Sequence, residues 1–132
     1  MENYPIALFG EAEKGDFGTA YFFQSLSQVI DSLGNPPPES QGMLYAVQTL
    51  LYERDLLFFR VKEEGFSYQD YFYGLRLLEK QEGELNISAI CLPGVGDREI
   101  IKVVTEICDL YKVCMITTEP DLYDLLTGLK AS

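Results

Sequence analysis

The stretch Ile6-Ala7-Leu8-Phe9-Gly10 decides the fold, because it is short, wholly apolar and closed by a glycine. A run of this kind is typical of a strand that is buried on both faces of a sheet. Residues 56–61, 87–92 and 114–118 have a similar character. Strands buried on both faces belong to parallel sheets that are covered by helices, so the four runs predict a four-stranded parallel sheet.

The segments between these strands have the spacing of amphipathic helices. Apolar residues recur every three or four positions over residues 20–33, 43–53, 68–79, 100–111 and 120–129. Strands that alternate with helices predict right-handed crossovers and helices on both faces of the sheet. We therefore expect a single α/β domain over residues 1–132, with a three-layer Rossmann-like or flavodoxin-like fold.

Composition and charge exclude several classes of partner. The chain has 10 basic and 21 acidic residues, which give a formal net charge of −11 and an isoelectric point near 4.3. A field of this sign repels the phosphates of nucleic acids and anionic lipid surfaces, so we expect neither nucleic acid nor membrane as a partner. No stretch approaches the roughly 20 apolar residues of a membrane span, and the N-terminus has no basic signal region, so we expect a cytoplasmic protein.

The cysteines do not predict a metal site. Cys91, Cys108 and Cys114 lie in apolar segments without a Cys-x-x-Cys spacing, and the sequence contains no histidine. Structural zinc needs such ligand sets, so we expect buried free thiols and no zinc. The absence of histidine also removes the usual base of a Ser or Cys nucleophile.

Any ligand site is expected at the carboxyl ends of the strands, where open parallel sheets bind their ligands. The loops at residues 10–19, 62–65, 93–97 and 117–121 meet there. Asp16 and Phe17 follow Gly10-x-x-x-x-Gly15 where a phosphate-binding P-loop has Lys and Ser or Thr, which excludes that motif. Acidic side chains occur in all four loops and could bind Mg²⁺. The alternative is that they are there because carboxylates stabilise the starts of helices. No other cofactor is predicted. The predicted ligand-binding residues are Gly10, Glu11, Gly94, Gly96, Asp97 and Glu119.

One of these loops resembles a family motif. The run Pro93-Gly94-Val95-Gly96-Asp97-Arg98-Glu99 is similar to the Pro-Gly-Gly-x-Gly-Thr-x-x-Glu loop of the lysine-decarboxylase-like phosphoribohydrolases, Rossmann-like enzymes that split nucleoside monophosphates. The likeness covers about thirty residues, is one residue short, and has Asp97 near the position of the family's threonine. The resemblance implies a nucleotide ligand and a catalytic role for Glu99, while the family's essential arginine has no counterpart.

A second candidate surface is the aromatic segment at residues 66–73, in which five of eight residues are Phe or Tyr. Tyr71 and Tyr73 lie off the apolar stripe of the predicted helix. Surplus tyrosine is typical of interface centres, so we expect these two residues in contact with a second copy or another protein, unless they pack locally.

Two functions remain open on the sequence alone. The first is a binding or protein-interaction module that acts on itself or on another protein, which the acidity, the tyrosines and the missing catalytic signatures favour. The alternative is a nucleotide- or nucleoside-handling enzyme, which the 93–99 loop favours. Small acidic secretion chaperones are similar in length and isoelectric point, but their antiparallel, strand-rich organisation differs from the alternating pattern here.

Overall fold

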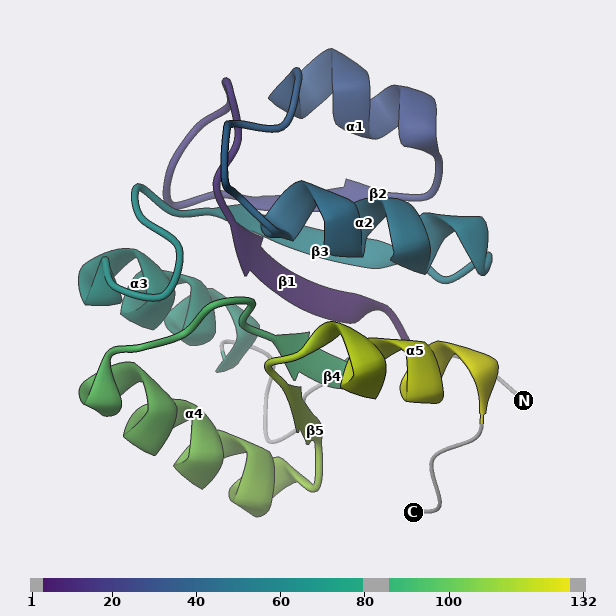
Figure 1. The fold of residues 1–132 in the computed structure, drawn as a ribbon. Helices are drawn as coiled ribbons and strands as arrows, with labels where there is room; N and C mark the ends of the chain where they lie inside the picture. The colour runs from purple at the N-terminus through teal and green to yellow at the C-terminus, as the bar shows by residue number, and fades with distance from the viewer. Residues whose placement is uncertain (1–3, 80–85, 129–132) are drawn as a thin grey trace.

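The computed structural model describes residues 4–79 and 86–128 (Figure 1). The described strands are β1 (Ile6–Gly10), β2 (Ala20–Phe23), β3 (Leu56–Arg60), β4 (Ala89–Cys91) and β5 (Cys114–Ile116). The described helices are α1 (Leu26–Leu33), α2 (Gly42–Leu51), α3 (Tyr68–Glu79), α4 (Arg98–Tyr111) and α5 (Glu119–Thr127). None of these helices is long and apolar enough to cross a membrane.

The sheet has the strand order β2-β3-β1-β4-β5, with β1 at its centre. β1 pairs in parallel with β3 on one side and with β4 on the other, so that Leu8 lies between Phe58 and Cys91. β5 continues the parallel arrangement beside β4. The predicted α/β fold is confirmed, and the four runs read as buried strands are parallel to one another.

The prediction of a four-stranded, wholly parallel sheet is wrong because residues 20–33 do not form one helix. Ala20–Phe23 is an edge strand that pairs antiparallel with β3, which makes the sheet five-stranded and mixed. Consecutive aromatic residues favour a strand, and the rings of Tyr21 and Phe23 stack on one face with centroids 5.7 Å apart. Helix α1 begins only afterwards, where Ser25 and Gln28 form a capping box.

Alternating residues of β1 enter two separate cores. Ile6 and Leu8 pack with α1, α2 and α5, whereas Ala7 and Phe9 pack with α3 and α4. Figure 1 shows the two groups of helices on opposite sides of the sheet. The structure therefore has three layers, as the uninterrupted apolar run of β1 requires.

Helix α3 buries a different face from the one that the sequence predicted. Tyr71 is fully buried and its ring stacks on Phe9 at 5.1 Å, so its expected exposure at an interface is wrong. This face is buried because of Gly74, one turn after Tyr71. Gly74 faces the Phe9 ring, and a Cβ at Gly74 would come within 2.5 Å of that ring. The small residue lets the helix approach the sheet through Tyr71, Gly74, Leu75 and Leu78.

Candidate functional site

The predicted crevice at the carboxyl ends of the strands is occupied by a side chain of the chain itself. The carboxylate of Glu64, which follows β3, accepts hydrogen bonds from the backbone N–H groups of Glu11 (2.9 Å), Gln41 (2.8 Å) and Gly42 (2.9 Å). Gln41 and Gly42 begin α2, whose N-cap has no side-chain hydrogen bond of its own. Glu64 therefore satisfies the free amides of this helix and complements its dipole, as a bound anion would.

The loops after β1 and β3 are tied to each other in both directions. The Glu64 N–H donates to the Glu11 carboxylate at 2.9 Å, while the Glu11 N–H donates to Glu64. The backbones of Gly10 and Gly42 lie in contact, and a Cβ at Gly10 would come within 2.8 Å of the Gly42 Cα. These contacts leave Glu11 and Gly10 in structural roles and fill the space between β1 and α2.

The rest of the loop after β1 is held down by Arg60 at the end of β3. The Arg60 guanidinium donates hydrogen bonds to the carbonyl oxygens of Ala12 and Gly15. It also lies 4.3 Å from the centre of the Phe17 ring, a cation–π contact. The loop is thereby folded over the strand end.

The loop after β4, which carries the family-like motif, is also bound to its neighbour. The N–H groups of Gly96 and Asp97 both donate to the Gly65 carbonyl at 3.1 Å. Asp97 is the N-cap of α4 and accepts hydrogen bonds from the N–H groups of Glu99 (2.8 Å) and Ile100 (3.3 Å). Gly65 has a φ of +87°, and a Cβ there would collide with the Gly94 carbonyl, so only glycine fits between the two loops.

The predicted ligand-binding residues are therefore only partly brought together. Gly10, Glu11, Gly96 and Asp97 surround Glu64 and Gly65, whereas Gly94 and Glu99 are exposed at the surface of the motif loop. Glu119 lies in the first turn of α5, and its carboxylate accepts a hydrogen bond from the Gln48 side chain at 2.7 Å. Across residues 4–79 and 86–128, no group of three or more His, Cys, Asp or Glu side chains could hold a metal ion.

Sequence reasoning missed the roles of Glu64 and Gly65. Both belong to a loop that the strand pattern identified, but Glu64 was counted only among the acidic side chains that suit Mg²⁺, and Gly65 was not singled out. Glu64 caps a helix that begins 22 residues earlier in the chain, and no local motif reports a contact over that distance. The available signal was Gly65 itself, a glycine directly after a buried strand and its acidic residues.

The buried titratable groups Tyr71, Cys91 and Cys108 have structural roles. The Tyr71 hydroxyl accepts the Gly65 N–H at 2.6 Å, and burial raises the pKa of Tyr71 above its ordinary value despite this hydrogen bond. Burial likewise raises the pKa of Cys91 well above its usual range and that of Cys108 to about 11. Thiols with such values are protonated at neutral pH and are poor nucleophiles.

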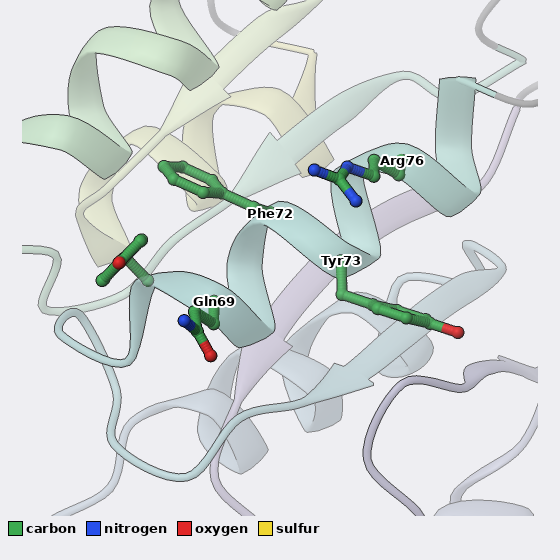
Figure 2. A pocket seen from close by; sticks show the side chains of 5 residues that line it. Gln69, Phe72, Tyr73 and Arg76 are labelled. Carbon is green, nitrogen blue, oxygen red and sulfur yellow. The ribbon is translucent and has the colours of Figure 1, made fainter.

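A shallow hollow lies along α3, at the aromatic segment predicted as an interface. Figure 2 shows the side chains of Gln69, Phe72, Tyr73 and Arg76 projecting from one stretch of this helix. The hollow has a volume of about 360 Å³ and a mixed polar and apolar lining. Tyr73 is 52% exposed there and lies against Gly18, so the structure leaves one of the two predicted interface tyrosines accessible.

A more apolar groove runs between α1 and α2, on the opposite side of the sheet from α3. Its volume is about 220 Å³. The residues that line the α1–α2 groove are Leu26, Val29, Ile30, Gly34, Asn35, Pro36, Met43, Leu44 and Val47. Ile30 is 59% exposed, Leu44 is 55% exposed, and Leu51 at the end of α2 is 65% exposed.

Helix α2 is apolar on both of its faces. Met43, Ala46 and Leu50 are buried against the sheet, while Leu44, Val47 and Leu51 lie on the outer face. A helix that is apolar all round is normally buried on all sides, and an exposed apolar patch marks a binding surface. The outer face of α2 therefore has the character of an interface.

Comparisons with protein-family models, with curated proteins and with solved structures found no match to this chain.

Proposed function

We propose that this protein is a protein-binding module and that the α1–α2 groove is its binding surface. The observation that carries the proposal is the outer face of α2, where Leu44, Val47 and Leu51 follow one another at helical spacing and remain exposed. These side chains are not needed to fill the core, because the inner face of the same helix already does so. A partner that covers them removes apolar surface from water.

The energy available on this surface is moderate. Complete burial of a Leu or Val side chain contributes about 1.5–3 kcal/mol relative to full exposure. Since the outer side chains of α2 are between 37% and 65% exposed, covering them contributes about 1 kcal/mol each. Together with Ile30 of α1 they form a small cluster of exposed aliphatic side chains.

The parallel strands follow the order of a flavodoxin-like domain, in which the crevice beside the central strand is the expected ligand position. Glu64 supplies an anion at that position and Asp97 caps α4, so both helix starts are already satisfied by carboxylates. This arrangement favours the binding module over a phosphate-binding enzyme. The free cysteines are compatible with a reducing compartment, which supports our proposal that the protein is cytoplasmic.

The nucleotide-handling enzyme is the alternative proposal, supported by one feature of the motif loop. Gly94 has a φ of +69° and nothing within 4 Å of its Cβ position, and the exposed Glu99 follows it at the start of α4. A thermal-shift panel of nucleoside monophosphates, with and without Mg²⁺, tests this alternative. A ligand present at 100 times its Kd adds about 2.7 kcal/mol of stability, and no shift with any member would exclude it.

The binding function is tested by differential capture from extracts of the cells that produce the protein. Wild type, Leu44→Ser/Val47→Ser and the control Leu110→Ser are immobilised; Leu110 is 70% exposed on α4, on the opposite side of the sheet. Captured proteins are identified, purified and measured by calorimetry. A partner that binds wild type and the control but not the groove variant supports the proposal. Equal binding to the groove variant, or no partner at all, would contradict it.

A further inference from the structure

We infer that the occupant of the α1–α2 groove is an amphipathic helix of another protein, with basic residues flanking its apolar stripe. The inference rests on the proposed binding function and adds the chemistry of the partner. Three features carry it, namely the apolar lining of the groove, the charges around it and the spacing of its exposed side chains.

The lining favours a helix over an extended strand. The groove offers few polar groups, since its walls are made of Leu, Val, Ile, Met and Pro side chains apart from Gly34 and Asn35. An extended segment would bring unpaired N–H and C=O groups against this surface, at a cost of about 1–3 kcal/mol for each group left unsatisfied. A helix satisfies its own backbone and presents only side chains.

The exposed residues of α2 have the spacing of a helix-docking surface. Leu44, Val47 and Leu51 lie at i, i+3 and i+7 on one face of the helix, and Leu44 and Val47 line the groove together with Ile30 of α1. Helices pack by setting the rows of side chains on one helix into the grooves of its neighbour. A third helix laid between α1 and α2 would meet apolar side chains from both.

The charges around the groove are negative. Residues 15–53, which include both helices, contain no Lys or Arg and carry Asp16, Asp31, Glu39 and Glu53. Asp31 and Glu39 are exposed, the first on α1 and the second in the loop that joins the two helices.

Glu13, which lies outside residues 15–53, adds a carboxylate at the end of the groove formed by Gly34 and Asn35. Glu13 accepts a hydrogen bond from the Asn35 N–H at 2.8 Å, beside the lining residue Gly34. Lys14 also reaches this end through a backbone hydrogen bond to Leu33, but the acids outnumber it. A basic flank on the ligand would complement this rim and raise the association rate.

The same charges oppose a second copy of this chain as the occupant. Two chains of net charge −11 repel each other, and a symmetric dimer through the groove would place the acidic rim of one copy against that of the other. Like charges in such a contact disfavour the complex.

The test uses labelled helical peptides of about 18 residues, five turns long, whose binding is followed by fluorescence anisotropy. One peptide has a leucine stripe flanked by lysines, the second has the same stripe flanked by glutamates, and the third is a scramble of the first. Each is titrated with wild type, Leu44→Ser/Val47→Ser, Asp31→Asn/Glu39→Gln and the control Leu110→Ser. Circular dichroism checks that every variant is folded.

We expect the lysine-flanked peptide to bind wild type about tenfold more tightly than the glutamate-flanked one, and to weaken as salt is raised. The groove variant should lose this binding, the charge variant should weaken it about threefold, and Leu110→Ser should leave it unchanged. If the lysine-flanked and glutamate-flanked peptides bind wild type with equal affinity, and the groove variant binds neither, the inference of a basic flank is overturned but the binding function stands.

Three other results would overturn the inference. Equal binding of the scrambled peptide, or full binding to the groove variant, would show charge attraction without docking. A dimer in light scattering that Leu44→Ser/Val47→Ser dissociates would make a second copy the occupant. If no peptide binds, the proposal that the ligand is a helix is refuted. The capture experiment then tests the binding function separately.

Discussion

Removal of the Glu64 carboxylate is the most direct test of how the crevice is closed. In Glu64→Ala the N–H groups of Glu11, Gln41 and Gly42 lose their acceptor, and the start of α2 loses its only cap among the described contacts. At about 1 kcal/mol for each hydrogen bond, the free energy of unfolding should fall by about 3 kcal/mol. Urea denaturation measures this change, with Glu63→Ala as the matched control because Glu63 is exposed one residue earlier.

The same variant should acquire an anion site that wild type lacks. With the carboxylate gone, sulfate or phosphate can accept the freed amides at the start of α2, and an anion at ten times its Kd restores about 1.4 kcal/mol. Because both anions also stabilise proteins in general, the response is compared with wild type and Glu63→Ala at the same concentrations. A loss no larger than that of Glu63→Ala, or an anion response equal to wild type, would refute the account of Glu64 as the cap of α2.

Three further predictions concern the buried groups. Tyr71→Phe should cost about 1–3 kcal/mol in urea denaturation because it strands the Gly65 N–H, whereas Tyr73→Phe should cost nothing measurable; equal losses would contradict the burial of Tyr71. Gly74→Ala should lower the thermal midpoint because its Cβ meets the Phe9 ring, although alanine stabilises an exposed helix position; a raised midpoint would contradict the contact. Burial raises the pKa of Tyr45 from 10.0 to about 12, so the neutral phenol is favoured in the folded state, and the stability that it contributes below pH 10 should be lost as the pH rises from 10 to 12. Between pH 10 and pH 12, the free energy of unfolding should fall less in Tyr45→Phe than in wild type. The same fall in both proteins would contradict the raised pKa of Tyr45.

The parallel strands could be predicted because each is encoded locally. A strand buried on both faces must be apolar at consecutive positions, and β1 and β3 meet that condition without help from distant residues. β2 does not, since only Phe23 of its four residues is buried. Aromatic residues at 21–23 fit the start of a helix as well as a strand, and the deciding signal was the capping box of Ser25 and Gln28, which starts the helix after them.

The orientation of α3 depended on one glycine. Tyr68, Phe72 and Leu75 also recur at helical spacing, and hydrophobic spacing alone does not distinguish the face that they share from the face that contains Tyr71. The choice is made by Gly74, which allows the helix to approach Phe9 closely only when that side faces the sheet. A glycine inside a helical pattern was therefore the available sign of the buried face.

The sequence pattern could not predict that the Glu64 carboxylate occupies the crevice. The topology correctly located the loops that meet at the strand ends, but whether such a crevice is open depends on where single side chains point. Glu64 contacts two segments of the chain, at Glu11 and at Gln41–Gly42, which are 53 and 22 to 23 residues away, and each contact is made to a backbone amide, which carries no sequence signature. Composition indicated acidic loops and could not indicate that their carboxylates are already used.

The closed crevice and the proposed groove are connected through α2. Glu64 connects the first residues of this helix to the ends of β1 and β3, and the backbones of Gly10 and Gly42 lie in close contact there. A binding surface held in one position loses less entropy when a partner docks, which strengthens the complex without any new contact. The Glu64 carboxylate thereby holds in place the helix whose outer face we propose as the protein-binding surface.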